Sequence, residues 1–287
     1  MRILLITLAS AASALVPLTG RVLPRVSDGA PIDVGEALGG PGTTLAILGT
    51  YAADFNMIEY GQRCRHYLPR LKDAGVGRVL CVVNGKPSSC TKLASLLDLP
   101  AEIELLSDEA GEAGREFGVA RGWLPDTDSF EVAGTEVPIS PYAKLLGMLV
   151  GLGAGNTLPS VITGYLGNPS GVHGWIESAL AQGQRQGRWP AMALDLGADG
   201  GVTRNAFDEL PVVGEWGRRP LELATLRLQT MLGVSLANWE ELQPTDERCL
   251  TQLGGLVAVR DGEVVYEYRD DGICAVADFE QLLKALA

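Results

Sequence analysis

Residues 43–64 read TTLAILGTYAADFNMIEYGQRC, and this stretch decides the fold. Its first nine residues form a short apolar run rich in β-formers, which predicts a buried strand. From about Phe55 to Ala74, apolar residues recur at helical spacing, so we expect a helix directly after the strand. Asp54 stands at the helix start, where a carboxylate can accept hydrogen bonds from the unpaired N–H groups of the first turn. Asn56, with Glu59 three residues later, is a second candidate for this cap.

The regions on either side of this stretch complete the fold class. After it come a second buried strand at 78–84, a helix at 87–97, a third strand within 101–108 and a short helix within 109–119. This order is typical of a parallel α/β core. The chain ends with a β-hairpin at 254–270 and an amphipathic helix at 276–287. A β-α-β front half and a β-β-α tail, split by a mostly helical insertion at about 122–246, predict a single thioredoxin-like α/β domain over residues 41–287.

The insertion contains an unusually apolar segment. Residues 140–169 hold one charged side chain, Lys144, and Gly and Pro divide them into two apolar pieces. We expect a buried helix pair here. The alternative is a surface element of residues 141–167 in peripheral contact with a membrane, because a true span needs about 20 unbroken apolar residues. Further along, the turn at 198–201 lies between two short alternating runs and predicts a hairpin.

Charge and composition exclude several classes of function. Acidic residues outnumber basic ones 35 to 23, and the net charge of -12 argues against nucleic acid as a partner. The two histidines, His66 and His173, have no ligand pattern around them, so we expect neither a metal nor a cofactor. The five cysteines form no Cys-x-x-Cys pair and are too few for a disulfide scaffold of this length.

The first 40 residues have the pattern of a targeting sequence. Residues 1–18 combine one basic residue, an apolar run and a series of small residues, which predicts a secretory signal peptide. Residues 19–40 carry Arg21 and Arg25 with no acid before Asp28, and are similar to the transit part of a plastid presequence followed by a linker. We therefore expect a plastid location, with plain secretion as the alternative.

Three stretches carry a resemblance to a known family: residues 44–85, residues 141–171 and residues 250–286. In order and spacing they resemble the peroxiredoxin-like branch of the AhpC/TSA superfamily, and they look close to its cyanobacterial and plastid members. The resemblance implies a thioredoxin-like fold and, as in several members, a thiol antioxidant activity. Related proteins place Cys-x-x-Cys or Thr-x-x-Cys at the helix start, and laid onto this chain that pair falls at about Asp54 and Met57.

Neither of these residues is a thiol. A cysteine at a helix start is reactive because the helix dipole and unpaired N–H groups stabilise its thiolate, and a carboxylate cannot replace that chemistry. Cys64 and Cys81 lie at apolar positions and are best interpreted as core residues. Cys90, in the first turn of its helix near Lys86, is the strongest candidate for a displaced nucleophile, although its position also suits core packing. Cys249 and Cys274 flank the last strands and are candidates for a disulfide.

These patterns predict a thioredoxin-fold protein without the usual redox cysteine. We expect a non-catalytic interaction or structural protein of the plastid whose insertion contacts a protein partner, such as a photosynthetic membrane complex at the thylakoid. The alternative is a thiol-dependent peroxidase or reductase that uses a displaced cysteine, Cys90 first.

Overall fold

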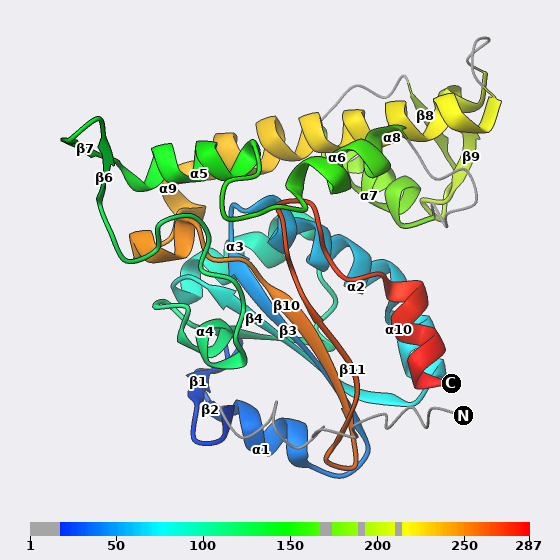
Figure 1. The fold of residues 1–287 in the computed structure, drawn as a ribbon. Helices are drawn as coiled ribbons and strands as arrows, with labels where there is room; N and C mark the ends of the chain where they lie inside the picture. The colour runs from blue at the N-terminus through cyan, green and yellow to red at the C-terminus, as the bar shows by residue number, and fades with distance from the viewer. Residues whose placement is uncertain (1–17, 167–173, 189–192, 210–213) are drawn as a thin grey trace, which may run out of the picture.

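The computed structural model describes residues 18–166, 174–188, 193–209 and 214–287. Its centre is a five-stranded sheet with the order β11-β10-β3-β4-β5 (Figure 1). These strands are β3 (Thr43–Tyr51), β4 (Val76–Asn84), β5 (Ile103–Ser107), β10 (Gly255–Arg260) and β11 (Glu263–Arg269). The helices of the sheet layer are α2 (Phe55–Asp73), α3 (Pro87–Leu97), α4 (Glu112–Phe117) and α10 (Phe279–Leu286).

The strand pairing confirms the predicted thioredoxin-like order. Strands β3, β4 and β5 are parallel and are connected through α2 and α3, whereas β10 runs antiparallel to β3 and β11 antiparallel to β10. The helix expected at about 55–74 ends at Asp73, one residue earlier. The β-α-β front half and the β-β-α tail therefore share one mixed sheet although more than a hundred residues separate them in the chain.

Every residue of β3 is buried, so the centre of the sheet is covered on both faces. Leu45 and Ile47 point to one face, where they join a core cluster with residues of α2, α3 and α10. Ala46 and Leu48 point to the other face, where residues of α4 and of the N-terminal segment cover them. This alternation explains why β3 reads as an unbroken apolar run and not as an alternating one.

The folded part begins earlier than expected. Residues 19–40 do not form a linker: they fold as β1 (Val22–Pro24), β2 (Pro31–Asp33) and α1 (Val34–Gly39). Leu18 and Leu38 are fully buried in the core cluster on the β3 Leu48 face. Two arginines fix the segment to the sheet layer, since Arg21 pairs with Glu112 of α4 at 2.5 Å and Arg25 with Glu104 of β5 at 3.2 Å. The predicted signal peptide falls almost wholly on residues 1–17, which lie outside the described residues.

The insertion is mostly helical, as predicted, and lies across the end of the sheet at which β3 and β4 finish (Figure 1). Its helices are α5 (Pro141–Leu149), α6 (Thr157–Leu166), α7 (Gly174–Arg185), α8 (Gly214–Thr230) and α9 (Trp239–Leu242). Three short 3-10 helices are η3 (Ala206–Glu209), η5 (Leu236–Asn238) and η6 (Glu247–Leu250), and η4 (Met231–Ser235) is a π-helical segment that continues from α8. The expected hairpin is present as β8 (Leu194–Leu196) and β9 (Val202–Asn205), and a second hairpin, β6 (Ser129–Val132) with β7 (Thr135–Pro138), was not predicted.

The expectation of a buried helix pair at 140–169 is wrong. Helices α5 and α6 form, but Leu146 is 65% exposed and Val150, directly after α5, is 64% exposed. Lys144, the charged side chain of the segment, is instead buried. Within the described part of the chain, no helix is both long and apolar enough to cross a membrane.

Candidate functional site

The candidate site is the start of α2, just beyond the end of β3. Asp54 is the N-cap: its Oδ1 accepts hydrogen bonds from the backbone N–H of Asn56 at 2.7 Å and from Thr50 Oγ1 at 2.9 Å. The first of the two cap candidates is therefore the cap, while Asn56 lies inside the helix with its side chain turned to other partners. A short acidic side chain here satisfies N–H groups that would otherwise have no acceptor.

Asp54 is only partly exposed, and this burial affects the pKa of its carboxyl group. Burial raises the pKa of Asp54 above its ordinary value, against the opposing effect of the hydrogen bonds from Thr50 and from the backbone of Asn56 and Met57. A reactive cysteine at a helix start needs the reverse: a lowered pKa of its thiol and a sulfur that solvent can reach. Asp54 thus caps the helix without supplying a nucleophilic sulfur.

Met57 occupies the second position of the expected pair, and it is a core residue. Its side chain is fully buried. Its sulfur packs so closely against Gly49 of β3 that a Cβ at position 49 would overlap it. Oxidants in solution therefore do not reach this sulfur, and the position is used for packing the helix onto the sheet.

The three cysteines of the front half are also core residues. Cys64, Cys81 and Cys90 are each at most 1% exposed, and burial raises the pKa of Cys64 and of Cys90 to about 12. A hollow of about 540 Å³ borders α3, but Ser88, Thr91 and Ser95 line it from the face of the helix opposite Cys90. The structure does not support Cys90 as a displaced nucleophile with a lowered pKa, because its thiol faces the core and donates to the Gly85 carbonyl at 3.8 Å.

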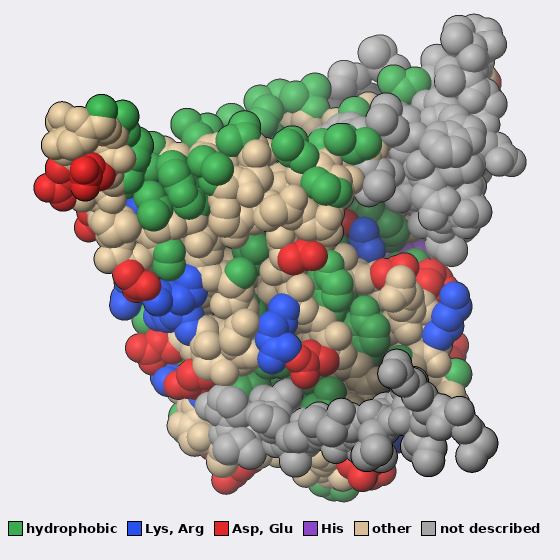
Figure 2. All heavy atoms as spheres, in the orientation of Figure 1, with side chains coloured by type: hydrophobic (Ala, Val, Ile, Leu, Met, Phe, Trp, Pro, Cys, Tyr) green, Lys and Arg blue, Asp and Glu red, His purple; other side chains and the backbone are tan. Residues whose placement is uncertain are grey.

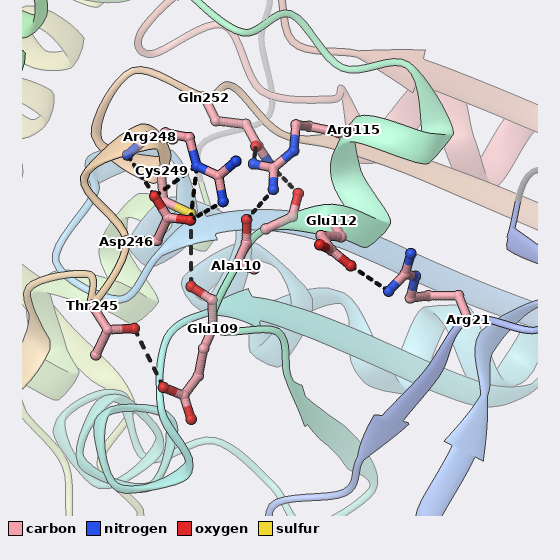
Figure 3. A network of polar contacts seen from close by, with 11 residues as sticks. Arg21, Glu109, Ala110, Glu112, Arg115, Thr245, Asp246, Arg248, Cys249 and Gln252 are labelled. Carbon is pink, nitrogen blue, oxygen red and sulfur yellow. Dashed lines mark hydrogen bonds and ion pairs between the residues drawn. The ribbon is translucent and has the colours of Figure 1, made fainter.

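The predicted Cys249–Cys274 disulfide does not form. Both thiols are free. Cys249, in η6, is buried and its thiol lies 3.9 Å from the Glu109 carbonyl oxygen, within a polar network that ties η6 to α4 (Figure 3). In the same network Arg115 donates to Gln252 Oε1 at 2.8 Å, and Gln252 Nε2 donates to the Gly111 carbonyl at 2.9 Å. Cys249 is thus a structural residue of the joint between the insertion and the front half.

Cys274 lies in a different place, beside the start of α2. Its backbone N–H donates to Asn56 Oδ1 at 2.7 Å, and its backbone has a φ of 68°, in the left-handed region. It is the one partly exposed cysteine of the chain, although burial still raises the pKa of its thiol. Nothing in the spacing of the sequence predicts this contact, because 218 residues separate Cys274 from Asn56.

A buried carboxyl stands behind the helix start. Asp270, directly after β11, is 1% exposed and accepts hydrogen bonds from Tyr60 Oη at 2.5 Å and from Asn56 Nδ2 at 2.9 Å. Burial raises the pKa of Asp270 to about 7, although both hydrogen bonds favour the charged form. These contacts tie the C-terminal strand to α2 and hold Asn56 in position.

The insertion covers the helix start. Ser235 of η4 donates a hydrogen bond from Oγ to the Ala53 carbonyl at 2.7 Å, in the loop that leads into α2. Above this loop is a cavity of about 140 Å³. Asp54 lies at its floor, Tyr51 and Trp239 line it, and Leu149, Met231 and Leu236 of the insertion complete the lining. A position that is open in a working thiol enzyme is here the base of a small, largely apolar pocket.

A buried ion pair fixes this cover to the core. Glu59 of α2 is 2% exposed and pairs with Arg227 of α8 and with Arg63 of α2. Burial opposes ionisation of Glu59, but the charges of Arg227 and Arg63 outweigh it and hold the pKa of Glu59 below its ordinary value. Arg63 also stacks 4.6 Å from the centre of the Trp175 ring of α7. Since one partner comes from the insertion and the other from the helix that carries the site, the pair couples the two regions.

Residues 64–272 match the AhpC/TSA antioxidant enzyme family. The chain belongs to this family. The matched part begins at Cys64, inside α2, so the match itself does not include Asp54 or Met57. In the part of this AhpC/TSA chain that the structure describes, no group of three or more His, Cys, Asp or Glu side chains could hold a metal ion.

The chain was also compared with solved structures and with curated proteins. Peroxidoxin BcpB from Mycobacterium tuberculosis is a solved structure with 18% sequence identity and a TM-score of 0.30, over 41% of this chain and 68% of that one. The comparison with curated proteins found no match.

Proposed function

We propose that this chain is a non-catalytic AhpC/TSA protein that works by binding a partner. The observation that carries the proposal is the start of α2, where Asp54 caps the helix, Met57 is buried and a cavity floor replaces an open site. A thiol peroxidase needs a cysteine whose pKa is lowered and whose sulfur solvent can reach. All five cysteines of this chain are largely buried, and burial raises the pKa of each.

The binding surface that we propose is the insertion. It is the part of the chain that is added to the thioredoxin-like order, and its apolar side chains are exposed over α5, α6 and α8. We propose a partner at a photosynthetic membrane in the plastid, either a protein complex or the membrane itself through residues 141–167. The signal-peptide pattern of residues 1–18 and the resemblance to plastid members support a plastid location. Residues 19–40 belong to the fold and do not count as a transit segment here, and secretion is the alternative.

A peroxide-consumption assay on the purified full chain tests the absence of catalysis. With a dithiol reductant present, we expect the rate of peroxide loss to equal that of a buffer control, and we expect Cys90→Ser and Cys274→Ser to leave it unchanged. Turnover by the wild-type chain that depends on one of these cysteines would contradict the proposal.

One observation favours a second candidate, a thiol-dependent peroxidase or reductase. Cys274 is partly exposed and lies beside the start of α2, held there by its hydrogen bond to Asn56. This candidate therefore uses Cys274 and not Cys90. It requires a conformational change that opens the surroundings of the thiol, because burial raises its pKa in the structure described here. Loss of turnover in Cys274→Ser, with Cys90→Ser still active, would support it.

A further inference from the structure

A continuous apolar surface runs along the outer side of the insertion. We define this apolar crest by six side chains that are each more than half exposed: Leu146, Val150, Ile162, Leu228, Leu232 and Leu236. The first three belong to the α5–α6 region and the last three to α8, η4 and η5. Figure 2 shows hydrophobic side chains gathered along this edge of the molecule, over the helices of the insertion. Contiguous apolar surface of this kind marks an interaction site in a water-soluble fold.

The few charged residues of the crest helices are buried. Between Val137 and Ile162 the sequence has one charged residue, Lys144, and it is 5% exposed. Between Leu221 and Trp239 it has two, Glu222 and Arg227, which are 0% and 9% exposed. The charged side chains thus face the protein. Leu223 and Leu226 are buried as well, so α8 presents apolar side chains both to the protein and to the outside, unlike a helix with a polar outer face. The outer surface of the crest carries no charge.

The composition of the crest favours hydrocarbon over a protein surface. All six defining side chains are aliphatic, and Tyr142 at the start of α5 is the aromatic residue of these helices that the structure shows exposed, at 47%. Protein interfaces instead depend on Trp, Tyr and Arg at their centres. Flexible aliphatic side chains can enter the acyl region of a bilayer without needing a matched partner for each one.

The charges near the crest indicate which lipids it can contact. Among the side chains that the structure describes in α5, α6, η4, η5 and residues 221–230 of α8, no Lys or Arg is exposed to meet an anionic headgroup. Glu131 and Glu136 are exposed on the adjacent β6–β7 hairpin. With a net charge of -12, the chain as a whole is repelled by an anionic surface. A bilayer of zwitterionic or uncharged lipids does not repel the chain in this way.

The cavity above Asp54 opens on the same surface. Leu149, Met231 and Leu236 line it and are also exposed on the outside of the insertion. The volume of about 140 Å³ suits the end of a hydrocarbon chain. A lipid chain can fill such a hollow because it adapts its shape to the cavity.

We propose that the apolar crest docks on the surface of a bilayer made of zwitterionic or uncharged lipids. The helices lie in the plane of the interface, with Leu146, Val150 and Leu236 inserted among the acyl chains and Lys144, Glu222 and Arg227 kept on the protein side. This inference rests on the proposed function, since it names the partner of the insertion surface. It adds that the membrane contact extends beyond residues 141–167 to α8, η4 and η5.

The test is vesicle flotation of the purified full chain. We expect it to float with vesicles of phosphatidylcholine, and to float less when phosphatidylglycerol replaces part of that lipid. Val150→Glu and Leu236→Glu should each lower the partition constant by about tenfold or more, because a carboxylate must then enter the interface. Val22→Glu is the matched control: Val22 is a similarly exposed valine on β1, outside the crest, and its substitution should change nothing.

Three results would overturn the proposal. The first is wild-type chain that does not float. The second is flotation that Val150→Glu and Leu236→Glu leave unchanged while circular dichroism shows both variants folded; residues 1–17 are the same in every variant, so their contribution cancels. The third is a wild-type dimer that Val150→Glu converts to a monomer, which would assign the crest to a second copy of the chain. None of these results bears on catalysis, whereas peroxide turnover by the wild-type chain would refute the non-catalytic function and leave lipid docking intact.

Discussion

The sheet layer and the apolar crest of the insertion differ in which side chains they expose. In the sheet layer, leucines such as Leu93 are fully buried and arginines such as Arg70 are exposed. In the insertion, Leu146 is exposed and Lys144 and Arg227 are buried. The first arrangement is the ordinary consequence of folding in water. The second leaves apolar surface exposed and desolvates charges, which fits the docking surface that we propose.

The largest effect is expected at the joint between the two regions. Arg227→Ala leaves Glu59 buried without its partner from the insertion, and we expect a loss of about 3–5 kcal/mol in the free energy of unfolding. Urea denaturation followed by circular dichroism measures it. Lys72→Ala, which removes an exposed pair with Glu102, is the control and should change stability little. A small effect of Arg227→Ala would mean that the insertion is not held by this pair.

The next largest effect is the difference in stability loss between truncating a core leucine and truncating a crest leucine. Leu93→Ala creates a cavity in the core and should cost about 2–5 kcal/mol, whereas Leu146→Ala on the crest should stay within about 0.5 kcal/mol of the wild type. Chemical denaturation of both variants in the absence of lipid provides the measurement. Equal losses in the two variants would show that Leu146 is covered in solution, and the contrast between the regions would then fail.

A smaller effect is a pH dependence that belongs to the sheet layer. The folded pKa of Asp270 is raised to about 7, so between about pH 4 and pH 7 the folded chain keeps a proton that the unfolded chain has lost. Stability should therefore fall as pH rises through this window, by on the order of 2–4 kcal/mol from this group.

Asp270→Asn should reduce that slope without abolishing it, because the pKa of Asp54 is raised as well. Thermal and urea denaturation at several pH values measure it. Asp28→Asn is the control: the pKa of Asp28 is lowered to about 2, so it does not titrate within the window. An unchanged slope in Asp270→Asn would assign the pH dependence to another group.

Much of the sheet layer could be predicted from sequence because its signals are local. The apolar run of β3, the helical spacing after Phe55 and the cap at Asp54 each depend on neighbouring residues, and each is present in the structure. The loss of a thiol at the helix start could be read in the same way, since it needs only the identity of Asp54 and Met57.

The errors came where burial depends on distant residues. Cys90 has the sequence position of a helix-start thiol, but packing turns its sulfur into the core. Residues 19–40 look like a linker because nothing near them shows that Leu18 and Leu38 will cover one face of the sheet. The apolar pieces of the insertion look like core helices because amino-acid composition alone does not say which side faces outward.

The sequence by itself determined the order of strands and helices in the sheet layer from β3 onward, the cap at Asp54 and the absence of a cysteine from the start of α2. Only the tertiary structure decided that Cys274 and Asp270 lie behind that helix start, that the insertion covers it, and that leucines face outward while Lys144, Glu222 and Arg227 face inward. The physical reason is the range of the interactions. Helix caps and hydrophobic periodicity act over a few residues, whereas the burial of a side chain is set by segments that can lie more than a hundred residues away.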